Sequence, residues 1–362
     1  MDVKKILVIR TSALGDVVHV LPAVGALHEL YPDASISWFI EPAAAGLVAC
    51  HPLIKKFFVF DRPGWKRSWR RPSAWPGLLG GLWRIVRALR AERFDLVVDF
   101  QCNVRSGVAV VLSGGRTRLG FARADCPEWG GRLFTNLKAP RCAQGIHKVE
   151  KNLALVRALG WRGEPPRPIL PVPEADREWA RSVIAQLPGS GPVIALHPAV
   201  SRFGEFKRWP VSHYRELIDL ARSKLDARIL ITWGPGEREL AESIGRPTVA
   251  PPIESPSRLA ALAASSAALV AADTGALHIA AALGTATVGI YGPKDERIYG
   301  PFPLAPHLRA IRSRVPCSPC KLRRCEHRIC MSMVFPEEVL RVLEEALASA
   351  STASSDMKNG SG

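Results

Sequence analysis

The sequence predicts an α/β protein made of two doubly wound domains. Short apolar runs typical of buried strands alternate with helical patterns, and this alternation stops at a proline-rich stretch and then starts again. A length of 362 residues also exceeds what one hydrophobic core usually holds. A composition of 47% hydrophobic and 23% charged residues is typical of a globular chain and excludes a disordered one.

The first domain, residues 1–165, alternates candidate strands with helical patterns. We expect strands at residues 5–9, 35–40, 56–60 and 96–100. Helical periodicity is found at residues 17–31 and 78–91. Strands separated by helices form βαβ units, so a parallel sheet is expected.

A proline-rich segment then separates the two halves. It contains Pro165, Pro166 and Pro168, with Pro171 and Pro173 close behind. Such a composition is typical of a stiff linker, so we place the domain boundary between residues 165 and 166.

The second domain, residues 166–335, repeats the alternation. Strands are expected at residues 193–197, 228–232, 267–272 and 287–291, and helices at residues 211–224, 257–265 and 276–283. A last helix, residues 336–350, has Pro336 in its first turn, where proline is tolerated best. The tail, residues 351–362, is rich in Ser and Gly, and we expect it to be disordered.

The charge balance predicts an anionic partner or surface. Lys and Arg number 49 against 33 Asp and Glu, a formal net charge of +16. Nucleic acid, acidic lipid head groups and phosphorylated substrates would all match this charge. No segment offers the roughly 18 clean apolar residues of a membrane span. The apolar start before Arg10 is too short for a secretory signal, so we expect a cytoplasmic protein.

Eight cysteines in a chain without an export signal favour reduced thiols or metal ligation over a disulfide framework. Cys317 and Cys320 form a CxxC pair, and Cys325 and Cys330 follow with a wider gap. Thiolates at this spacing suit tetrahedral zinc, so a structural zinc site is one hypothesis. Disulfides and unligated buried thiols are the alternatives.

The segment from Asp273 to His278 is the most informative part of the chain. It follows an apolar run and precedes an alanine-rich helical pattern, which predicts a strand, a loop and a helix N-terminus. In open α/β sheets ligands bind at this place, and unpaired amides at a helix start attract phosphate. The alternative is an ordinary N-cap, in which the Asp273 or Thr274 side chain satisfies those amides.

Two other loops carry charged residues after a predicted strand. Asp16 follows Gly15 where the first loop becomes a helix, so its carboxylate would either cap that helix or act as a base. Lys207 and Arg208 precede Trp209, in the loop after the strand at 193–197, and are well placed to meet phosphate. The alternative there is a solvated loop anchored by Trp209.

Together these segments resemble glycosyltransferase family 9, the ADP-heptose:lipopolysaccharide heptosyltransferases. The resemblance spans residues 4 to 345, and four marks in the family's order carry it: residues 9–16, 207–210, 273–278 and 291–293. The N-terminal mark is most like the heptosyltransferase I branch, and the cysteine-rich C-terminal segment is more like other members, including heptosyltransferase II types.

The resemblance implies the GT-B architecture, two Rossmann-like domains facing across a cleft, with the last helix returning to the N-terminal domain. It also implies an inverting, metal-independent transfer of heptose from ADP-heptose, with no cofactor required. The absence of any Asp-x-Asp motif from the sequence fits this expectation.

The resemblance further implies roles for the marked residues. Asp16 would be the catalytic base. Lys207 and the amides of Thr274 and Gly275 would hold the leaving diphosphate, beside Asp273. Glu237 matches the family's ribose-binding acid, and His278 would approach the phosphates or the heptose, a satisfied core histidine being its alternative.

This sequence departs from the family pattern at two places on the donor side. Ala13 stands where the heptosyltransferase I branch has a second serine. The loop between His197 and Lys207 is longer than in that branch, which leaves Ser201 and Arg202 as candidate donor contacts only.

A segment that interleaves cations and indoles is the candidate acceptor side. Its cations include Arg62, Lys66, Arg67 and Arg70, and its indoles are Trp65, Trp69 and Trp75. By itself such a segment suits single-stranded nucleic acid, a lipid surface or a solvated loop. The resemblance favours an anionic glycolipid of the Kdo-lipid A type at the inner leaflet, adds Arg105 as a further cation, and implies peripheral association with the inner membrane.

The leading hypothesis is therefore a heptosyltransferase that acts on Kdo2-lipid A or heptosyl-Kdo2-lipid A. A family 9 transferase with another nucleotide sugar or acceptor is the alternative within enzymes. A basic nucleic-acid-binding protein is the alternative outside them, and we do not expect nucleic acid as a partner.

Overall fold

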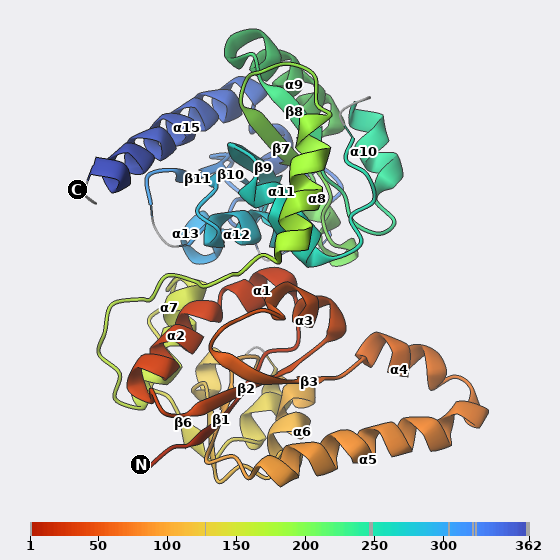
Figure 1. Ribbon diagram of the computed structural model, residues 1–362, viewed down its shortest axis with the longest axis vertical. Coiled ribbons are helices and arrows are strands. Elements are labelled where there is room, and N and C mark those ends of the chain that lie inside the picture. The colour runs from red at the N-terminus through yellow and green to blue at the C-terminus, as the bar shows by residue number, and fades with distance from the viewer. Residues whose placement is uncertain are drawn as a thin grey trace. The chain divides into compact units, whose positions relative to one another are not determined.

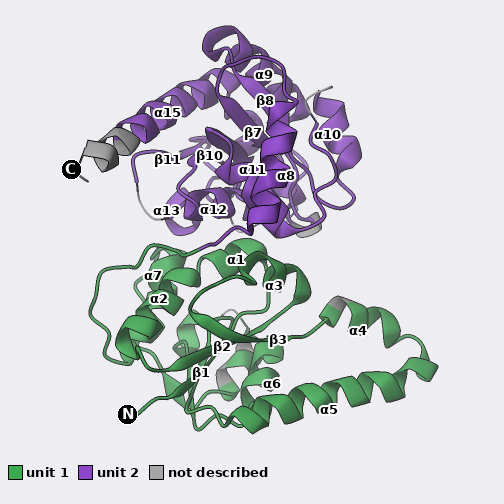
Figure 2. Cartoon of the chain, in the orientation of Figure 1, with its two compact units in different colours: residues 1–169 green, residues 170–362 purple. Residues whose placement is uncertain are grey.

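A computed structural model describes residues 2–126, 128–245, 249–302, 305–320, 322 and 324–359. The chain divides into two compact units, Met1–Ile169 and Leu170–Gly362 (Figure 2). The division falls four residues after the boundary expected at 165/166. Each unit has its own parallel sheet, so the predicted α/β class with two doubly wound units is confirmed.

The described part of unit 1 forms a six-stranded parallel sheet in the order β3-β2-β1-β4-β5-β6 (Figure 1). The strands are β1 (Lys5–Ile9), β2 (Ser35–Ile40), β3 (Ile54–Val59), β4 (Leu96–Asp99), β5 (Thr117–Gly120) and β6 (Leu137–Lys138). In register, Ile6 lies opposite Ile36 on one side and Leu96 on the other. Two sides of β1 are therefore paired, which places it in the middle of the sheet.

Unit 1 also contains helices, most of which connect these strands. They are α1 (Leu14–Val18), α2 (Leu21–Leu30), α3 (Pro42–Val48), α4 (Arg62–Ser68), α5 (Trp75–Glu92), α6 (Val104–Leu112) and α7 (Lys148–Ala158). Leu7 and Ile9 point to one face of the sheet and pack with Leu89 of α5 and Val110 of α6. One helix was expected over 17–31, but α1 ends at Val18 and α2 begins at Leu21, because Pro22 lacks the N–H that a continuous helix needs.

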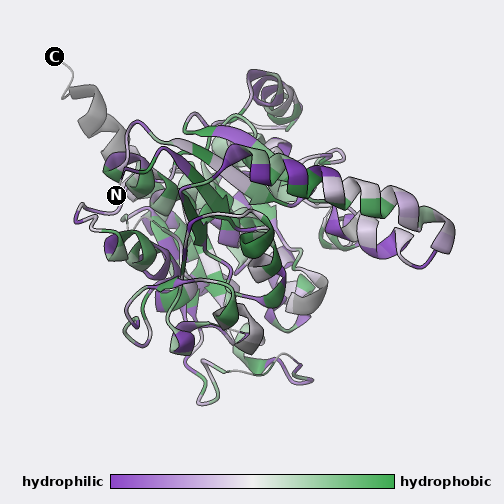
Figure 3. Cartoon of the chain, turned by 90° about the horizontal axis from the view of Figure 1, so that it is seen from below, coloured by the Kyte–Doolittle hydropathy of each residue, from purple (hydrophilic) through white to green (hydrophobic). Residues whose placement is uncertain are grey.

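Helices α4 and α5 project from the sheet of unit 1 as an arm (Figure 1). Helix α5 is 18 residues long, and Leu89, near its C-terminal end, is its one buried residue among those described. Figure 3 shows hydrophilic and hydrophobic residues interleaved along it. The arm therefore exposes a mixed surface to solvent.

The described part of unit 2 contains a five-stranded parallel sheet in the order β11-β10-β9-β7-β8. The strands are β7 (Val193–His197), β8 (Arg228–Ile231), β9 (Ala268–Ala272), β10 (Ala286–Tyr291) and β11 (Leu308–Arg312). The helices are α8 (Glu174–Ala185), α9 (Val211–Leu225), α10 (Arg238–Ile244), α11 (Pro256–Ala264), α12 (Gly275–Ala282), α13 (Glu296–Tyr299), α14 (Ile329–Ser332) and α15 (Pro336–Asn359). Helices α9 and α15 bury one face of the sheet, and α11 and α12 bury the other.

The last helix, α15, packs within unit 2. Its stripe of Val339, Leu340, Leu343 and Ala346 is buried in the core that contains Trp209. The sequence led us to expect that this helix returns to the N-terminal domain; its buried face contacts the core of unit 2. The helix also continues to Asn359, so residues 351–359, expected to be disordered, are helical; residues 360–362 lie outside the described residues.

No helix within the described ranges is long and apolar enough to cross a bilayer.

Candidate functional site

The sheet of unit 2 has its topological switch point between β7 and β9. The chain leaves β7 toward β8 on one side and comes back to β9 on the other, so the loops after β7 and β9 meet at the carboxyl edge. Lys207 ends the 3-10 turn Arg202–Lys207 after β7, and Asp273 follows β9 directly. Open α/β sheets bind ligands at such switch points.

Lys207, Asp273 and His278 form one cluster at this edge. Lys207 Nζ lies 2.5 Å from Asp273 Oδ2, and His278 Nε2 lies 3.4 Å from Asp273 Oδ1. Burial raises the pKa of Asp273, but the hydrogen bond from His278 and the charge of Lys207 outweigh it and hold that pKa below its usual value. The cluster therefore presents a carboxylate between two nitrogen donors.

The amides that open α12 are not capped by a side chain. Thr274 occupies the N-cap position with extended backbone angles, but its side chain makes no capping hydrogen bond. Thr274 Oγ1 is buried without a hydrogen-bond partner among the described residues. The Asp273 carboxylate contacts Lys207 and His278 instead. The ordinary N-cap is therefore wrong as an explanation of this segment, and the N–H groups that start at Gly275 remain available to an anion.

The neighbouring strand β8 brings Glu237 to the same edge of the sheet. Glu237 stands at the N-cap position of α10, and its Oε2 accepts a 2.7 Å hydrogen bond from the Gly234 N–H. Burial raises the pKa of this carboxyl group, although the Gly234 bond opposes the rise. At the end of β7, His197 Nδ1 lies 3.0 Å from Thr232 Oγ1, and burial lowers the pKa of His197 to about 4. This imidazole is neutral near pH 7 and ties β7 to β8.

Unit 1 has its own switch point, between β1 and β4. The loop after β1 contains Arg10, which ion-pairs with Asp16 and donates through Nη1 to the Phe100 carbonyl at 2.9 Å. Thr11 donates through its backbone N–H and its hydroxyl to Gln101 Oε1, both at 2.9 Å. The loops after β1 and β4 are therefore bound to each other.

Asp16 is not a capping residue. It lies in the first turn of α1, whose N-cap position is occupied by Ala13 without a side-chain hydrogen bond. Its side chain is 37% exposed and its carboxylate contacts Arg10. Of the two roles that the sequence left open for Asp16, helix capping is excluded.

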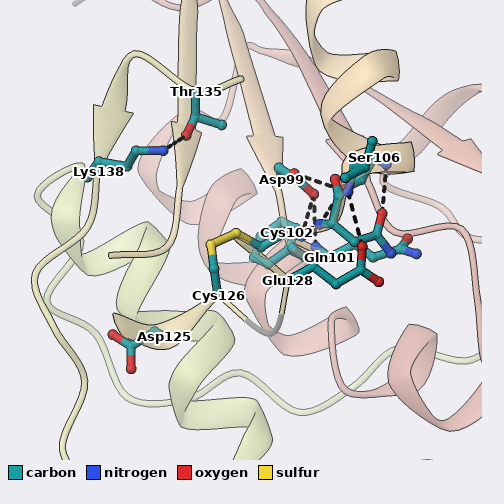
Figure 4. Close-up of a disulfide and its surroundings, with 12 residues drawn as sticks. Asp99, Gln101, Cys102, Ser106, Asp125, Cys126, Glu128, Thr135 and Lys138 are labelled. Carbon is teal, nitrogen blue, oxygen red and sulfur yellow. Dashed lines mark hydrogen bonds between the residues drawn. A yellow bond between two sulfur atoms is a disulfide. The ribbon is translucent and has the colours of Figure 1, made fainter. Parts of the chain in front are cut away.

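Asp99 is a buried carboxyl group that the sequence reasoning missed (Figure 4). It accepts hydrogen bonds from the N–H groups of Gln101 and Cys102 and from Ser106 Oγ. Burial raises its pKa, although these bonds oppose the rise. The sequence signal for this residue was an acid near the carboxyl end of the apolar run 96–100. The hydrogen bonds that Asp99 accepts organise the loop that leads to Arg105.

The comparison with known protein families decides the classification. Residues 82–329, more than half of the chain, match the family described as glycosyltransferase family 9 (heptosyltransferase). The chain belongs to this family. It is therefore a glycosyltransferase.

Relatives of this family 9 enzyme span nearly its full length. It is 28% identical to lipopolysaccharide heptosyltransferase 1 of Pseudomonas aeruginosa, over 96% of this chain and 99% of that protein. It is also 28% identical to lipopolysaccharide heptosyltransferase 1 of Escherichia coli K12, over 82% of this chain and 91% of that protein. Among solved structures, E. coli heptosyltransferase WaaC with ADP has a TM-score of 0.72 at 25% identity and covers 94% of this chain and 99% of that chain. These matches agree with the GT-B fold expected from the resemblance.

The five acceptor-side cations of the family 9 enzyme separate into two groups. Arg62 in α4 and Arg105 in α6 line one cavity of unit 1, and Arg62 Nε lies 2.7 Å from Glu41 Oε1. The others, Lys66, Arg67 and Arg70, are exposed on the arm and do not line that cavity. The sequence pattern grouped the four cations of residues 62–70, the resemblance added Arg105, and in the fold Arg105 lines the same cavity as Arg62.

The indoles of the arm stack on one another. The ring centroids of Trp65 and Trp69 lie 6.3 Å apart, and those of Trp69 and Trp75 lie 5.3 Å apart. Trp75 Nε1 also donates to the Trp69 carbonyl at 3.0 Å. These contacts hold the turn between α4 and α5. The indoles therefore stabilise the arm and also form part of its exposed surface.

Two of the eight cysteines are joined. Cys102, after β4, and Cys126 form a disulfide with their Cα atoms 5.5 Å apart (Figure 4). The expectation of reduced or metal-bound thiols is wrong for this pair, because the fold brings segments 24 residues apart in the sequence within bridging distance. The bridge ties the loop before α6 to the turn around residue 126.

The C-terminal cysteines are not arranged as a metal site. Cys317 and Cys325 are exposed, Cys320 is half-buried and Cys330 is buried, and all four are free thiols. Within the described ranges, no group of three or more His, Cys, Asp or Glu side chains is positioned to hold a metal ion. Burial, and after it the neighbouring thiols, raises the pKa of Cys330 to about 11. The structure gives the zinc hypothesis no support.

Proposed function

We propose that this enzyme transfers heptose from ADP-L-glycero-D-manno-heptose to the lipopolysaccharide inner core, on Kdo2-lipid A or heptosyl-Kdo2-lipid A. The observation that carries the proposal is the uncapped start of α12 beside Lys207, at the switch point of unit 2. The names of the relatives in P. aeruginosa and E. coli, and the ADP in the similar WaaC structure, support the donor and the type of acceptor.

On the donor side, unit 2 stabilises the leaving diphosphate. Breaking the anomeric bond leaves negative charge on ADP and builds positive charge on the sugar ring. The N–H groups at the start of α12 and the ammonium group of Lys207 stabilise that negative charge without a metal ion. Asp273 and His278 hold Lys207 at the edge of the sheet until the donor arrives. Glu237 binds the ribose hydroxyls from the end of β8.

On the acceptor side, unit 1 supplies the base. Asp16 removes the proton of the attacking hydroxyl, and attack from the face opposite ADP inverts the anomeric centre. Arg10 orients the Asp16 carboxylate through their ion pair, and its bond to the Phe100 carbonyl fixes Arg10 in turn. Arg62 and Arg105 contact the anionic groups of the acceptor.

The arm of unit 1 attaches the enzyme to the inner leaflet from the cytoplasmic side. Trp69, Leu79 and Trp83 are each more than half exposed. Lys66, Arg67 and Arg70 lie on the same arm and are exposed. Indoles at the head-group level together with cations against acidic lipids give peripheral binding without a spanning helix.

A panel of nucleotide sugars tests the function. The enzyme is incubated with each nucleotide sugar and Kdo2-lipid A, with and without EDTA, and the lipid is measured by mass spectrometry. We expect the mass of one heptose to be added from ADP-heptose, with or without EDTA. Transfer from another nucleotide sugar alone would make that sugar the donor, and loss of transfer in EDTA would refute a metal-independent reaction.

A further inference from the structure

Unit 1 contains an apolar cavity of about 260 Å³ at the carboxyl edge of its sheet. The residues at the ends of three strands reach it: Thr11 after β1, Phe39 in β2 and Phe60 after β3. Side chains of α5 and α6 form its walls, among them Val86 and Ala109. Neither the heptose nor the nucleotide of the donor is apolar, so the proposed donor site does not explain this space.

A stripe of apolar residues on α5 leads into the cavity. Trp75, Leu79, Leu82, Val86 and Leu89 follow one another at helical spacing, and so share one face of the helix. The first two are 43% and 58% exposed on the arm, while Leu82, Val86 and Leu89 line the cavity. The exposed surface of the arm that is proposed to meet lipid is thus continuous along α5 with this partly open apolar cavity.

Charged groups in the cavity lining favour an anionic ligand. Glu41 is neutralised by Arg62, at 2.7 Å. Arg105 makes no ion pair with any described residue, so the lining keeps one uncompensated positive charge. Thr11 also lines the cavity. It follows Arg10 in the sequence, and Arg10 forms the ion pair with Asp16. An apolar chain that carries an anionic head group matches this arrangement.

We propose that this cavity holds one acyl chain of the acceptor glycolipid, with the anionic groups of that lipid at Arg62 and Arg105. The assignment rests on the proposed function, because that function supplies an acylated, anionic acceptor. Acyl binding in unit 1 would select the lipid-linked acceptor over its free sugar and hold it beside the loop that carries Asp16.

Filling the cavity tests the proposal. Val86→Phe adds a ring at a half-buried position in the lining. Val111→Phe is the matched control, because Val111 is 43% exposed on α6 and does not line the cavity. Leu82→Phe is a second filling variant for use if Val86→Phe lowers the Tm.

The first readout is the binding of dodecyl phosphate, kept below its micellar concentration, by titration calorimetry. We expect one site per wild-type chain and no comparable binding of inorganic phosphate. Val86→Phe should weaken the binding by about tenfold or more, since each methylene kept out of an apolar site loses burial energy. Val111→Phe should leave it unchanged. Equal binding by the wild type and both filling variants would overturn the proposal.

The second readout is the KM for Kdo2-lipid A and for its fully deacylated form. Val86→Phe should raise the KM of the acylated acceptor and leave those of the deacylated acceptor and ADP-heptose unchanged. If the variant binds dodecyl phosphate weakly but keeps its KM for Kdo2-lipid A, the cavity takes another lipid and the proposal is wrong. If the wild type transfers heptose to neither acceptor, the proposed function fails, and dodecyl phosphate still decides whether the cavity binds an acyl chain.

Discussion

At the residue scale, the main feature of the proposed donor site is the ion pair between Lys207 and Asp273, which forms without a bound donor. The two side chains satisfy each other, so a half-buried ammonium group and a mostly buried carboxylate are held at the edge of the sheet without uncompensated charge. In the proposed mechanism, a diphosphate that approaches the start of α12 meets an ammonium group already in place. Preorganisation of this kind avoids the cost of reordering the site during the reaction.

Replacing Lys207 tests this arrangement. Lys207→Ala removes a charged hydrogen-bond donor, so we expect ADP-heptose to bind about tenfold or more weakly and transfer to be slower. Lys224→Ala is the matched control, because Lys224 is exposed in the last turn of α9 and lies outside the proposed donor site. Titration calorimetry with ADP and steady-state kinetics measure both effects. Unchanged ADP affinity and rate in Lys207→Ala would remove this residue from the site.

Two buried histidines should make the stability of the protein depend on pH. Burial lowers the pKa of both His197 and His51 to about 4, from 6.5. Between pH 6.5 and 4 the unfolded histidine binds a proton and the folded one does not, so stability falls as the pH falls through this window. For the fully buried His197 the loss is about 3 kcal/mol.

Urea unfolding at pH 7 and pH 5 measures this effect. His197→Asn keeps a polar partner for Thr232 but does not titrate, so its stability should fall less between the two pH values than that of the wild type. The double variant with His51→Asn should show the smallest fall. Identical pH dependence in the wild type and the double variant would show that these histidines do not carry the effect.

At the element scale, α15 belongs to the core of unit 2. Leu343 is fully buried among the residues that pack on the sheet, and the Trp209 N–H donates to the Val334 carbonyl just before the helix. Because Trp209 also ends the loop that carries Lys207, the packing of α15 supports that loop. The helix is thus a structural part of unit 2.

Truncating a buried side chain of α15 tests this packing. Leu343→Ala should lower the free energy of unfolding of unit 2 by about 3 kcal/mol, through lost burial and the cavity left behind. Glu344→Ala, on the exposed face, should change it little. Urea denaturation followed by tryptophan fluorescence measures both. A Leu343→Ala variant as stable as Glu344→Ala would mean that the helix does not pack as described.

The sequence predicted the elements best where local signals agreed. The strands at 5–9, 35–40 and 193–197 have the predicted bounds, since each is a short run rich in apolar residues. The helix expected at 17–31 is broken by Pro22, a local signal that we did not apply. The destination of α15 could not be predicted, because an apolar stripe shows that a helix is buried but not against which sheet.

At the scale of the whole molecule, the sequence predicted where the site residues lie along the chain, but it did not predict which of them contact one another. The order of the strands brings the Lys207 loop to Asp273, and the sequence placed both after strands, which is the part that was predictable. The Cys102–Cys126 bridge and the cavity at Arg62 and Arg105 arise from segments distant in the sequence. No local pattern encodes such contacts.

The division of the chemistry between the two units is the central claim: unit 2 stabilises the leaving ADP, and unit 1 supplies Asp16 as the base. The most direct test is the rate at which Kdo2-lipid A gains one heptose from ADP-heptose, with the wild type and with Asp16→Ala, followed by mass spectrometry. The account predicts transfer by the wild type, and loss of transfer in Asp16→Ala with ADP affinity largely kept. Transfer by Asp16→Ala at the wild-type rate would contradict it.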